Sequence, residues 1–471
     1  MSVINTNIPS ITAVHKLRAN QNDLQIRLER LSTGLRINRG KDDPAGLIAS
    51  ETLRNEMRGI SQSINNSQRA INVISTAEGA LNEISSLLLD IRGLVNHVAN
   101  VGAISSEEVE ADQLQIDSII EAIDRISNTT QFGGRKLING NFEYTTSGID
   151  ATAITTMTVF GARVPPNSYQ NVTVEVTQSA QTAQVTFSAG AGLTENVTIE
   201  IKGNGGMEVV TITSGMNATS ITNTINAVAD TTGVSATVSG TSVILNSREY
   251  GSDALVSVKP IDGNFIVSTG STQKVYGQDA GVLINGQQAS TQGLQASLRA
   301  NGLDLQMLLT ADRGTNLGST DFQITGGGAT FQIGPEVNSN GQVSIGIPSV
   351  GSSNLGNADV GFLFTIKDGG IYTVKDIGNT TQAEKIVVEA IQQVATLRGR
   401  LGGLQKNQIE TNINSQNIAL ENVTAAESAI RDADIAQEVA AMTRSQILVQ
   451  STTAILRVAN QIPQTALSLL Q

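Results

Sequence analysis

The chain has 471 residues, of which 39% are hydrophobic and only 3% aromatic, and it contains neither cysteine nor tryptophan. Its formal net charge of −12 argues against a nucleic-acid partner, because a phosphate backbone requires a basic surface. The missing cysteines exclude disulfides, thiol catalysis and cysteine-ligated metals, and no apolar run is long enough for membrane insertion. A chain of this length is expected to form about two to four domains.

The two ends of the chain carry matching heptad patterns. Near the start, apolar residues recur at the a and d spacing, with one break at Gln21: Val14, Leu17, Leu24, Leu28, Leu31 and Leu35. Near the end, the same rule is followed by Ile435, Val439, Met442, Val449 and Leu456. A stripe this narrow needs a partner helix, so we predict that the two ends pair as a coiled coil. The pattern alone leaves open two amphipathic helices that pack separately on one globule.

Stronger helices are predicted inside these end segments. Asp43 and Pro44 are typical of an N-cap followed by proline at the first helical position. From there an apolar stripe without proline continues to Val98, and Ser105 with Glu108 forms a second predicted start, a capping box. A third apolar stripe runs from Val387 to Leu404. The three stripes predict a helical bundle that is assembled from both ends of the chain.

The middle of the chain has the alternation of β-strands. Val172, Val174 and Val176 alternate with polar residues, and residues 197–201 repeat the pattern. Gly-rich segments at residues 203–206 and 326–328 indicate turns, and residues 220–229 predict one short helix on a sheet. The predicted fold class is therefore multidomain α+β, with long helices from both chain ends and a β-rich α+β central insertion.

The chain carries no pattern typical of catalysis or metal binding. Its two histidines, His15 and His97, lie far apart, and neither has a helical partner that would complete a zinc pair. Gly-rich segments lack the Gly-Lys-Ser/Thr sequence of a phosphate loop, and the close acidic pairs fit helix capping. We therefore predict that the protein is not an enzyme and has no cofactor and no metal site.

Short motifs near both ends resemble those of bacterial flagellins. On the N-terminal side these are residues 4–7 (INTN), 31–38 (LSTGLRIN), 41–47 (KDDPAGL) and 131–137 (QFGGRKL). On the C-terminal side they are residues 432–436 (DADIA), 442–448 (MTRSQIL), 459–464 (ANQIPQ) and 467–470 (LSLL). The middle is similar to an insertion module of that family, built around residues 224–227 (TINA).

The resemblance implies a subunit that polymerises with itself into the flagellar filament and whose ends fold on assembly. Residues 1–43 with 429–471 would form the inner coiled coil, and residues 44–165 with 380–428 a helical rod with a β-hairpin region. Residues 166–379 would form the variable outer domains, with the insertion module near 195–260. The implied assembly seam consists of Leu17, Leu24, Leu28, Leu31, Leu35, Ile435, Val439, Met442, Val449 and Leu456.

The family also implies partners and a route of export. The partners are the flagellar cap, the hook–filament junction proteins and an export chaperone at the C-terminal segment. The start of the chain has neither a basic region nor an apolar region of a secretory signal, which agrees with flagellar type III export to the cell exterior without a cleaved signal.

Some residues depart from the family pattern. The segment from Leu89 to His97 aligns with a patch that a host Toll-like receptor reads in some flagellins. Arg92 and Leu94 are retained as a remnant of this patch, but Asp90 replaces an expected arginine and Gln115 an expected glutamate. Charge reversal at an interface is costly, so these departures argue against recognition by the receptor.

Three alternatives to a plain filament subunit are compatible with parts of this pattern. The nearest is a hook–filament junction protein, which shares the helical ends but would not polymerise into long filaments. The motifs at residues 459–470 favour the filament subunit. The others are a flagellin with an enzyme in its middle, which the missing metallopeptidase motif disfavours, and an adhesin with a glycan-binding middle domain.

Overall fold

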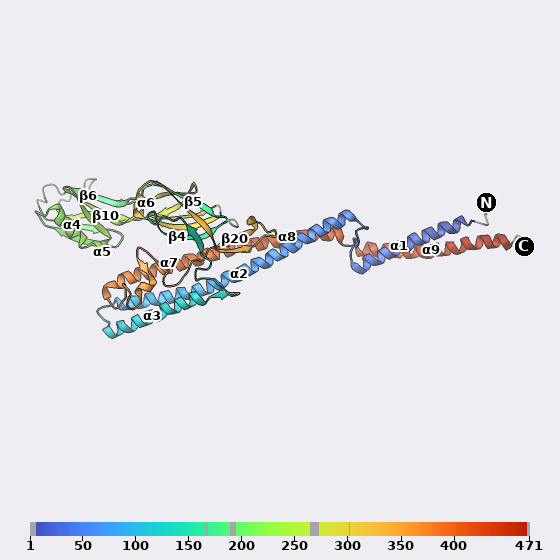
Figure 1. Ribbon diagram of the computed structural model, residues 1–471, viewed down its shortest axis with the longest axis horizontal. Helices are drawn as coiled ribbons and strands as arrows, with labels where there is room; N and C mark the ends of the chain where they lie inside the picture. Colours follow the sequence, from blue (N-terminus) through green and yellow to red (C-terminus); the bar gives the residue numbers. More distant parts are fainter. Residues whose placement is uncertain (1–5, 165–167, 189–194, 264–272, 301, 469–471) are drawn as a thin grey trace. The chain divides into compact units, whose positions relative to one another are not determined.

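The computed structural model describes residues 6–164, 168–188, 195–263, 273–300 and 302–468, and parts of the predicted end motifs lie outside these ranges. The described chain divides into two compact units. The first contains residues 1–68, 332–341 and 407–471, and the second contains residues 69–331 and 342–406. Long helices at both ends and a β-rich middle confirm the predicted α+β fold class (Figure 1).

The first unit is built from helices. Its elements are α1 (Ile8–Thr33), the first part of α2 (Pro44–Val98), the 3₁₀ turn η1 (Ser339–Gly341), α8 (Thr411–Arg431) and α9 (Ile435–Ser468). The Asn7 side chain caps α1 by accepting from the Ser10 N–H at 3.1 Å. Gly34 ends the helix at φ +71°, a conformation that a side chain would strain.

The predicted start of α2 is confirmed. The Asp43 carboxylate accepts from the Gly46 N–H at 2.9 Å, and Pro44 is the first helical residue. α2 then lies beside α8 within the first unit, where Ser50 donates to the Glu427 carboxylate at 2.9 Å.

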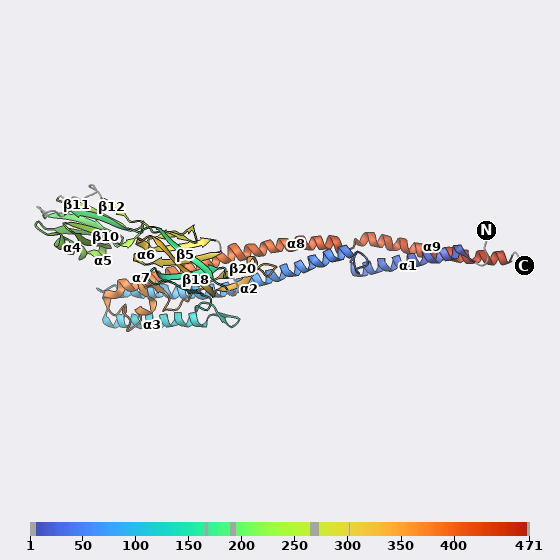
Figure 2. The same cartoon turned by 45° about the horizontal axis from the view of Figure 1, so that its top comes forward.

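The helical part of the second unit contains the rest of α2, α3 (Ser106–Thr129) and α7 (Thr380–Leu404), which lie side by side (Figures 1 and 2). Arg92 of α2 pairs with Glu384 of α7 at 3.3 Å. The predicted capping box at Ser105 and Glu108 is present. A single π-helical turn, η4 (Gln405–Glu410), follows α7 and was not predicted. The apolar stripes of all three helices are buried, which confirms the predicted bundle.

The segment from residue 346 to residue 379 is held against α3 by several side chains of that helix. Asp124 accepts from the Ser352 N–H at 2.7 Å, and Asp117 accepts from the Asp368 N–H at 3.0 Å. Gln113 is completely buried, its side-chain N–H donates to the Ile366 carbonyl at 3.0 Å, and its oxygen accepts from the Val374 N–H at 3.0 Å. This segment contains β21 (Gly356–Asn357), β22 (Gly361–Phe362), η2 (Leu363–Ile366) and η3 (Ile377–Asn379).

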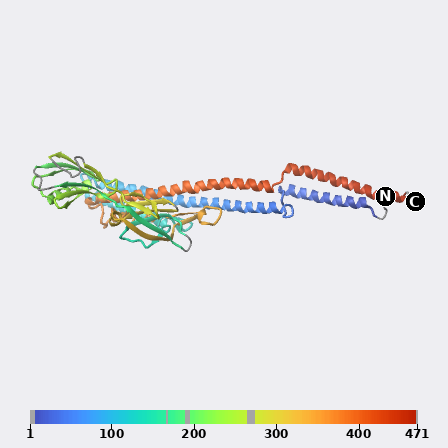
Figure 3. The same ribbon diagram turned by 90° about the horizontal axis from the view of Figure 1, so that it is seen from above.

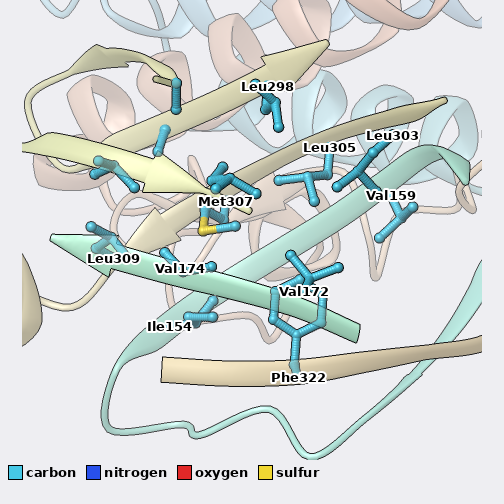
Figure 4. Packing of buried hydrophobic residues seen from close by; sticks show 14 of the residues in the cluster. Ile154, Val159, Val172, Val174, Leu298, Leu303, Leu305, Met307, Leu309 and Phe322 are labelled. Carbon is cyan, nitrogen blue, oxygen red and sulfur yellow. The ribbon is translucent and has the colours of Figure 1, made fainter. Parts of the chain in front are cut away.

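Two sheets enclose one core of the β-rich part. One has the order β14-β13-β5-β18-β3 and the other β15-β16-β17-β4. Their strands are β3 (Tyr144–Ser147), β4 (Ile154–Ala162), β5 (Gln170–Gln178), β13 (Gly281–Ile284), β14 (Gln287–Gln288), β15 (Ser290–Gln292), β16 (Gln295–Ala300), β17 (Leu303–Leu309) and β18 (Gly318–Gly327). Val172 and Val174 of β5 face Leu305 and Met307 of β17 across this core (Figure 4). The helix α6 (Ala311–Thr315) joins the two sheets, with β17 before it and β18 after it.

Two further sheets form a second core. Their orders are β6-β10-β9 and β12-β11-β7-β8. The strands are β6 (Thr182–Ser188), β7 (Val197–Lys202), β8 (Met207–Ile212), β9 (Val234–Ser239), β10 (Ser242–Tyr250), β11 (Leu255–Asp262) and β12 (Gln273–Tyr276). Ile199 and Ile201 of β7 are completely buried, together with Ile221 and Ile225 of α4 (Ala218–Asn226). Small two-stranded sheets are formed by β1 (Gln131–Phe132) with β2 (Arg135–Lys136), by β19 (Ala329–Gln332) with β20 (Gln342–Ile345), and by β21 with β22.

Two local predictions for the middle were wrong. The single helix predicted at residues 220–229 is two helices, α4 and the short α5 (Ala229–Thr232). Asn226 ends α4 because its side chain bonds the backbone of β9, donating to the Ala236 carbonyl and accepting from the Ala236 N–H. The predicted turn at residues 326–328 begins later, because Gly326 and Gly327 still belong to β18.

Candidate functional site

The helices of the two chain ends, α1 and α9, lie side by side and run in opposite directions (Figures 1 and 3). Two backbone hydrogen bonds, which we call the clamp, join them where α1 ends and α9 begins. The Arg36 N–H donates to the Arg431 carbonyl at 2.7 Å, and the Ala433 N–H donates to the Gly34 carbonyl at 2.9 Å. We call the surface along which the two helices meet the seam. It brings together segments that are more than 400 residues apart in the sequence.

Six of the predicted seam residues lie along this surface. They recur at heptad spacing on each helix and are partly buried in the single chain: Leu17, Leu24, Leu31, Met442, Val449 and Leu456. Leu35 is also partly buried, but it lies just beyond α1 and forms a β-bridge with Asp432 in the clamp.

The other three predicted residues are exposed. Leu28 is 47% exposed, Ile435 50% and Val439 42%. In α1 the exposed Leu28 follows Arg27, and Arg27 is the residue that faces α9. Ala13, Asn20 and Arg27 recur at heptad spacing on the side of α1 that faces the partner helix, and Ala13 is buried.

Charged and polar side chains occupy the seam between the apolar residues. Glu438 of α9 is only 7% exposed, although it is a carboxylate. Arg27 donates to both of its carboxylate oxygens, at 2.9 and 3.1 Å, and Arg30 donates at 3.0 Å. The sequence prediction missed these residues because it counted only apolar ones. The heptad spacing of Asn20 and Arg27 was the available signal.

The electrostatics of this cluster favour the charged forms of Glu438 and Arg27. Burial acts to raise the pKa of Glu438, but the hydrogen bonds from Arg27 and Arg30 outweigh it and hold the pKa below its ordinary value. The hydrogen bond to Glu438 is the main cause that raises the pKa of Arg27. A buried ion pair of this kind is stable only while every partner is present.

Further polar contacts continue along the same seam. Asn7 donates to the Ala459 carbonyl at 2.8 Å, and Ser10 donates to Asn460 at 2.8 Å. Asn20 contacts Thr452 at 3.5 Å, and the Ser445 hydroxyl donates to Asp23.

The side of α9 away from α1 is exposed and carries apolar residues together with Thr443 and Ser451. At about 100° per residue, Ile447 and Val458 point away from the seam, and each is 57% exposed. Ala436, Ala440 and Ala454 lie on the same side and are also exposed. We call this surface the outer stripe. An apolar groove of about 390 Å³ lies at the other end of the pair from the clamp and is lined by Ile8, Pro9, Thr12, Ala13, Lys16, Thr452 and Ile455.

The predicted remnant of a receptor patch lies in the second unit. Arg92 is engaged within the chain by Glu384, and Leu94 is half-buried.

Among the described residues there is no group of three or more histidine or acidic side chains that could hold a metal ion. His15 is exposed on α1, and His97 bonds Asp112 at 2.6 Å on the surface, which raises the pKa of His97. No helix in the described ranges is long and apolar enough to cross a membrane.

Comparison with known families gives matches at both ends and in the middle. The N-terminal helical region of bacterial flagellin matches residues 4–143, and its C-terminal helical region matches residues 385–470. The flagellin hook IN motif matches residues 198–248, within the second β core.

Similar proteins cover almost the whole chain. Flagellin of Bacillus subtilis is 26% identical over 99% of both chains, and flagellin D of Vibrio cholerae is 29% identical over 99% of both. Among solved structures, hook associated protein-3 of Legionella pneumophila is 11% identical, with a TM-score of 0.32, and covers 81% of this chain and 98% of its own. The flagellar cap protein FliD of Escherichia coli is 15% identical, with a TM-score of 0.26, over 52% and 64% of the two chains.

Proposed function

We propose that α1 and α9 form the surface through which copies of this chain join. The chain belongs to the bacterial flagellin family and is a subunit of a flagellar filament. The observation that carries this proposal is the outer stripe. A helix that is already paired through its seam presents isoleucine and valine on its opposite side, at 57% exposure. Exposed apolar patches of this kind mark interaction sites.

The apolar side chains left exposed on the paired helices would stabilise association once neighbouring copies bury them. Complete burial of one such side chain contributes about 1.5–3 kcal/mol. Ile8, Ile11, Ile447, Ile455 and Val458 are all at least half exposed in the single chain. Neighbouring copies that cover them would supply the burial that the lone pair lacks.

Folding of the ends would then be coupled to assembly. Ordering one residue costs about 1–2 kcal/mol in backbone entropy, and α1 buries only Ala13 among its 26 residues. We infer that the ends are weakly ordered in the free subunit and fold completely at the tip of the filament.

The arrangement favours an open polymer. The outer stripe of α9 and the groove beside Ile8 and Thr12 are different surfaces of one chain, so a contact between them joins unlike faces. Such a heterologous contact produces a helical filament when its rotation does not close.

We also propose domain boundaries, which rest on the resemblance to flagellins. We propose residues 1–43 with 429–471 as the inner assembly domain and residues 44–165 with 380–428 as the helical rod. Residues 166–379 would form the outer domains. The assembly seam of the filament would consist of the ten residues predicted from the sequence. Of these, Leu28, Ile435 and Val439 are exposed in the single chain and would contact neighbouring copies.

The role is structural and not enzymatic. The flagellar cap and the hook–filament junction proteins would meet the two ends of the filament, and an export chaperone would bind the C-terminal segment before assembly. We also propose that the chain is exported through the flagellar apparatus without a cleaved signal.

Replacement of one seam leucine tests the function. Leu31→Asp places a carboxylate between α1 and α9, so we expect no filaments when the purified chain is seeded with filament fragments and viewed by electron microscopy. The matched control is Met207→Asp on β8, because Met207 is 54% exposed and lies in the outer part of the second unit. The control should assemble normally.

Two outcomes would contradict the proposal. Filaments from Leu31→Asp would show that the seam is not used. Failure of the unchanged chain to extend the seeds would favour a hook–filament junction protein, provided that circular dichroism shows the chain to be folded.

A further inference from the structure

The buried charges of the seam need an explanation beyond packing. An ion pair in a protein interior is often no more stable than apolar residues of similar size. The chain nevertheless keeps Glu438 at 7% exposure, held by two arginines. The Nε atoms of Arg27 and Arg30 are buried without a hydrogen-bond partner, which adds to the cost.

We propose that Arg27, Arg30 and Glu438 determine the register in which α1 pairs with α9. This inference rests on the pairing of the chain ends that the proposed function uses. The apolar seam residues cannot fix the register by themselves. They repeat at heptad spacing, so a shift by one heptad again places leucine against methionine, valine or leucine.

The charged residues do distinguish the registers. If α9 moves by one heptad toward the start of α1, Glu438 leaves both arginines and meets Asp23, which has the same charge. If α9 moves by one heptad the other way, both arginines meet Ser445 and Glu438 passes the end of α1 at Thr33. Only the observed register pairs all three charges, and a buried charge that loses its partner is strongly destabilising.

The polar contacts farther along the seam agree with this register. Asn20 lies against Thr452 and the Leu448 carbonyl, at 3.5 and 3.4 Å, and Asn7 donates to the Ala459 carbonyl. A shift of one heptad would break these contacts as well. A single polar layer can specify the register of a coiled coil at a cost in stability, and here the charged cluster has that role.

The backbone clamp is the competing explanation. Its bonds between Gly34, Arg36, Arg431 and Ala433 also fix where the two helices start. The test must therefore change the charges and leave the clamp intact.

Engineered cysteine pairs measure the register directly, because the natural chain has no cysteine. Asn20→Cys with Thr452→Cys reports the observed register and is called the native-register pair. Asn20→Cys with Ser445→Cys and Asn20→Cys with Ala459→Cys report shifts by one heptad in the two directions. Each pair is placed in the full chain, which is assembled, oxidised and analysed by mass spectrometry. Only cross-links within one chain are counted.

Three charge sets are then compared. With the natural charges we expect cross-linking only of the native-register pair. With Arg27→Leu, Arg30→Leu and Glu438→Leu together, cross-links in a shifted register should appear. With Asp23→Lys, Arg27→Glu, Arg30→Glu and Glu438→Arg together, shifted cross-links should be lost again. The inverted charges pair only in the original register, and residue 438 again meets a like charge at position 23 when it is shifted. Exclusive cross-linking of the native-register pair in the all-leucine variant would overturn the proposal and assign the register to the clamp.

Electron microscopy of the same samples separates this inference from the proposed function. If the natural chain forms no filaments, the proposed function fails. If the all-leucine variant forms filaments with an unshifted register, the proposed function stands and the role of the charges is refuted.

Discussion

α1 and α3 have similar lengths but differ in how much they bury within one chain. α3 buries six of its 24 residues, whereas α1 buries one of its 26, and α8 buries none of its 21. Apolar residues are not lacking in the chain ends, because α1 and α9 expose Ile11, Ile447 and Val458. The difference is that the apolar face of α3 is buried against other elements of its own chain. The terminal helices carry apolar surface that their own chain leaves exposed, and we propose that other copies cover it.

The largest expected effect is on the outer stripe. Ile447→Asp places a charge where a neighbouring copy would bury an isoleucine, and burying an unpaired charge is prohibitive. We expect complete loss of filaments in seeded assembly, with an unchanged circular dichroism spectrum, because the side chain is 57% exposed in the single chain. Val238→Asp on β9, 42% exposed, is the matched control. Assembly of Ile447→Asp at the normal rate would show that the outer stripe faces solvent in the filament.

The second effect is on the β-rich part and should spare assembly. Leu245 of β10 is completely buried in the second β core. Leu245→Ala removes these contacts and leaves a cavity, which lowers the free energy of unfolding by about 2–5 kcal/mol. Calorimetry should show an earlier transition of this core, while seeded filaments still form. Loss of filaments at a temperature where the core remains folded would contradict the separation of the two regions.

A smaller effect is expected on the pH dependence of assembly. The pKa of Glu438 is held below its ordinary value, so its bonds to Arg27 and Arg30 stabilise the folded pair above the ordinary pKa of a glutamate. This stabilisation is lost as the pH falls through the lowered pKa, where the carboxylate is protonated. Filaments of the natural chain should therefore dissociate more steeply with acid than those of Glu438→Gln.

Light scattering during acid titration measures this difference. Glu427→Gln on α8 is the control, because that carboxylate bonds Ser50 and lies outside the seam. Superimposable titration curves for Glu438→Gln and the natural chain would show that Glu438 does not contribute to the pH dependence.

Much of the fold could be predicted from the sequence, because caps and periodicity are local signals. Pro44 after Asp43 and the capping box at Ser105 predicted two helix starts that the structure confirms. The alternating valines of residues 172–176 predicted a strand that the structure contains. The end of α4 at Asn226 was missed because it depends on bonds to Ala236 of a strand later in the chain.

The candidate site was predicted only in part. Leu17, Leu24 and Leu31 were found because apolar residues at heptad spacing are a strong pattern. Arg27 and Glu438 were missed because a buried charge is recognisable only when its partner is known, and here the partners lie 411 residues apart. The sequence also cannot separate the apolar residues that meet within one chain from those exposed for other copies.

Amide hydrogen exchange of the free chain and of the filament tests most directly whether the chain ends are completed by other copies. We predict rapid exchange in α1 and α9 of the free chain and strong protection in the filament. Exchange in the two β cores should be the same in both states. Equal, strong protection of α1 and α9 in the free chain would show that the ends are already complete, and would contradict the central claim.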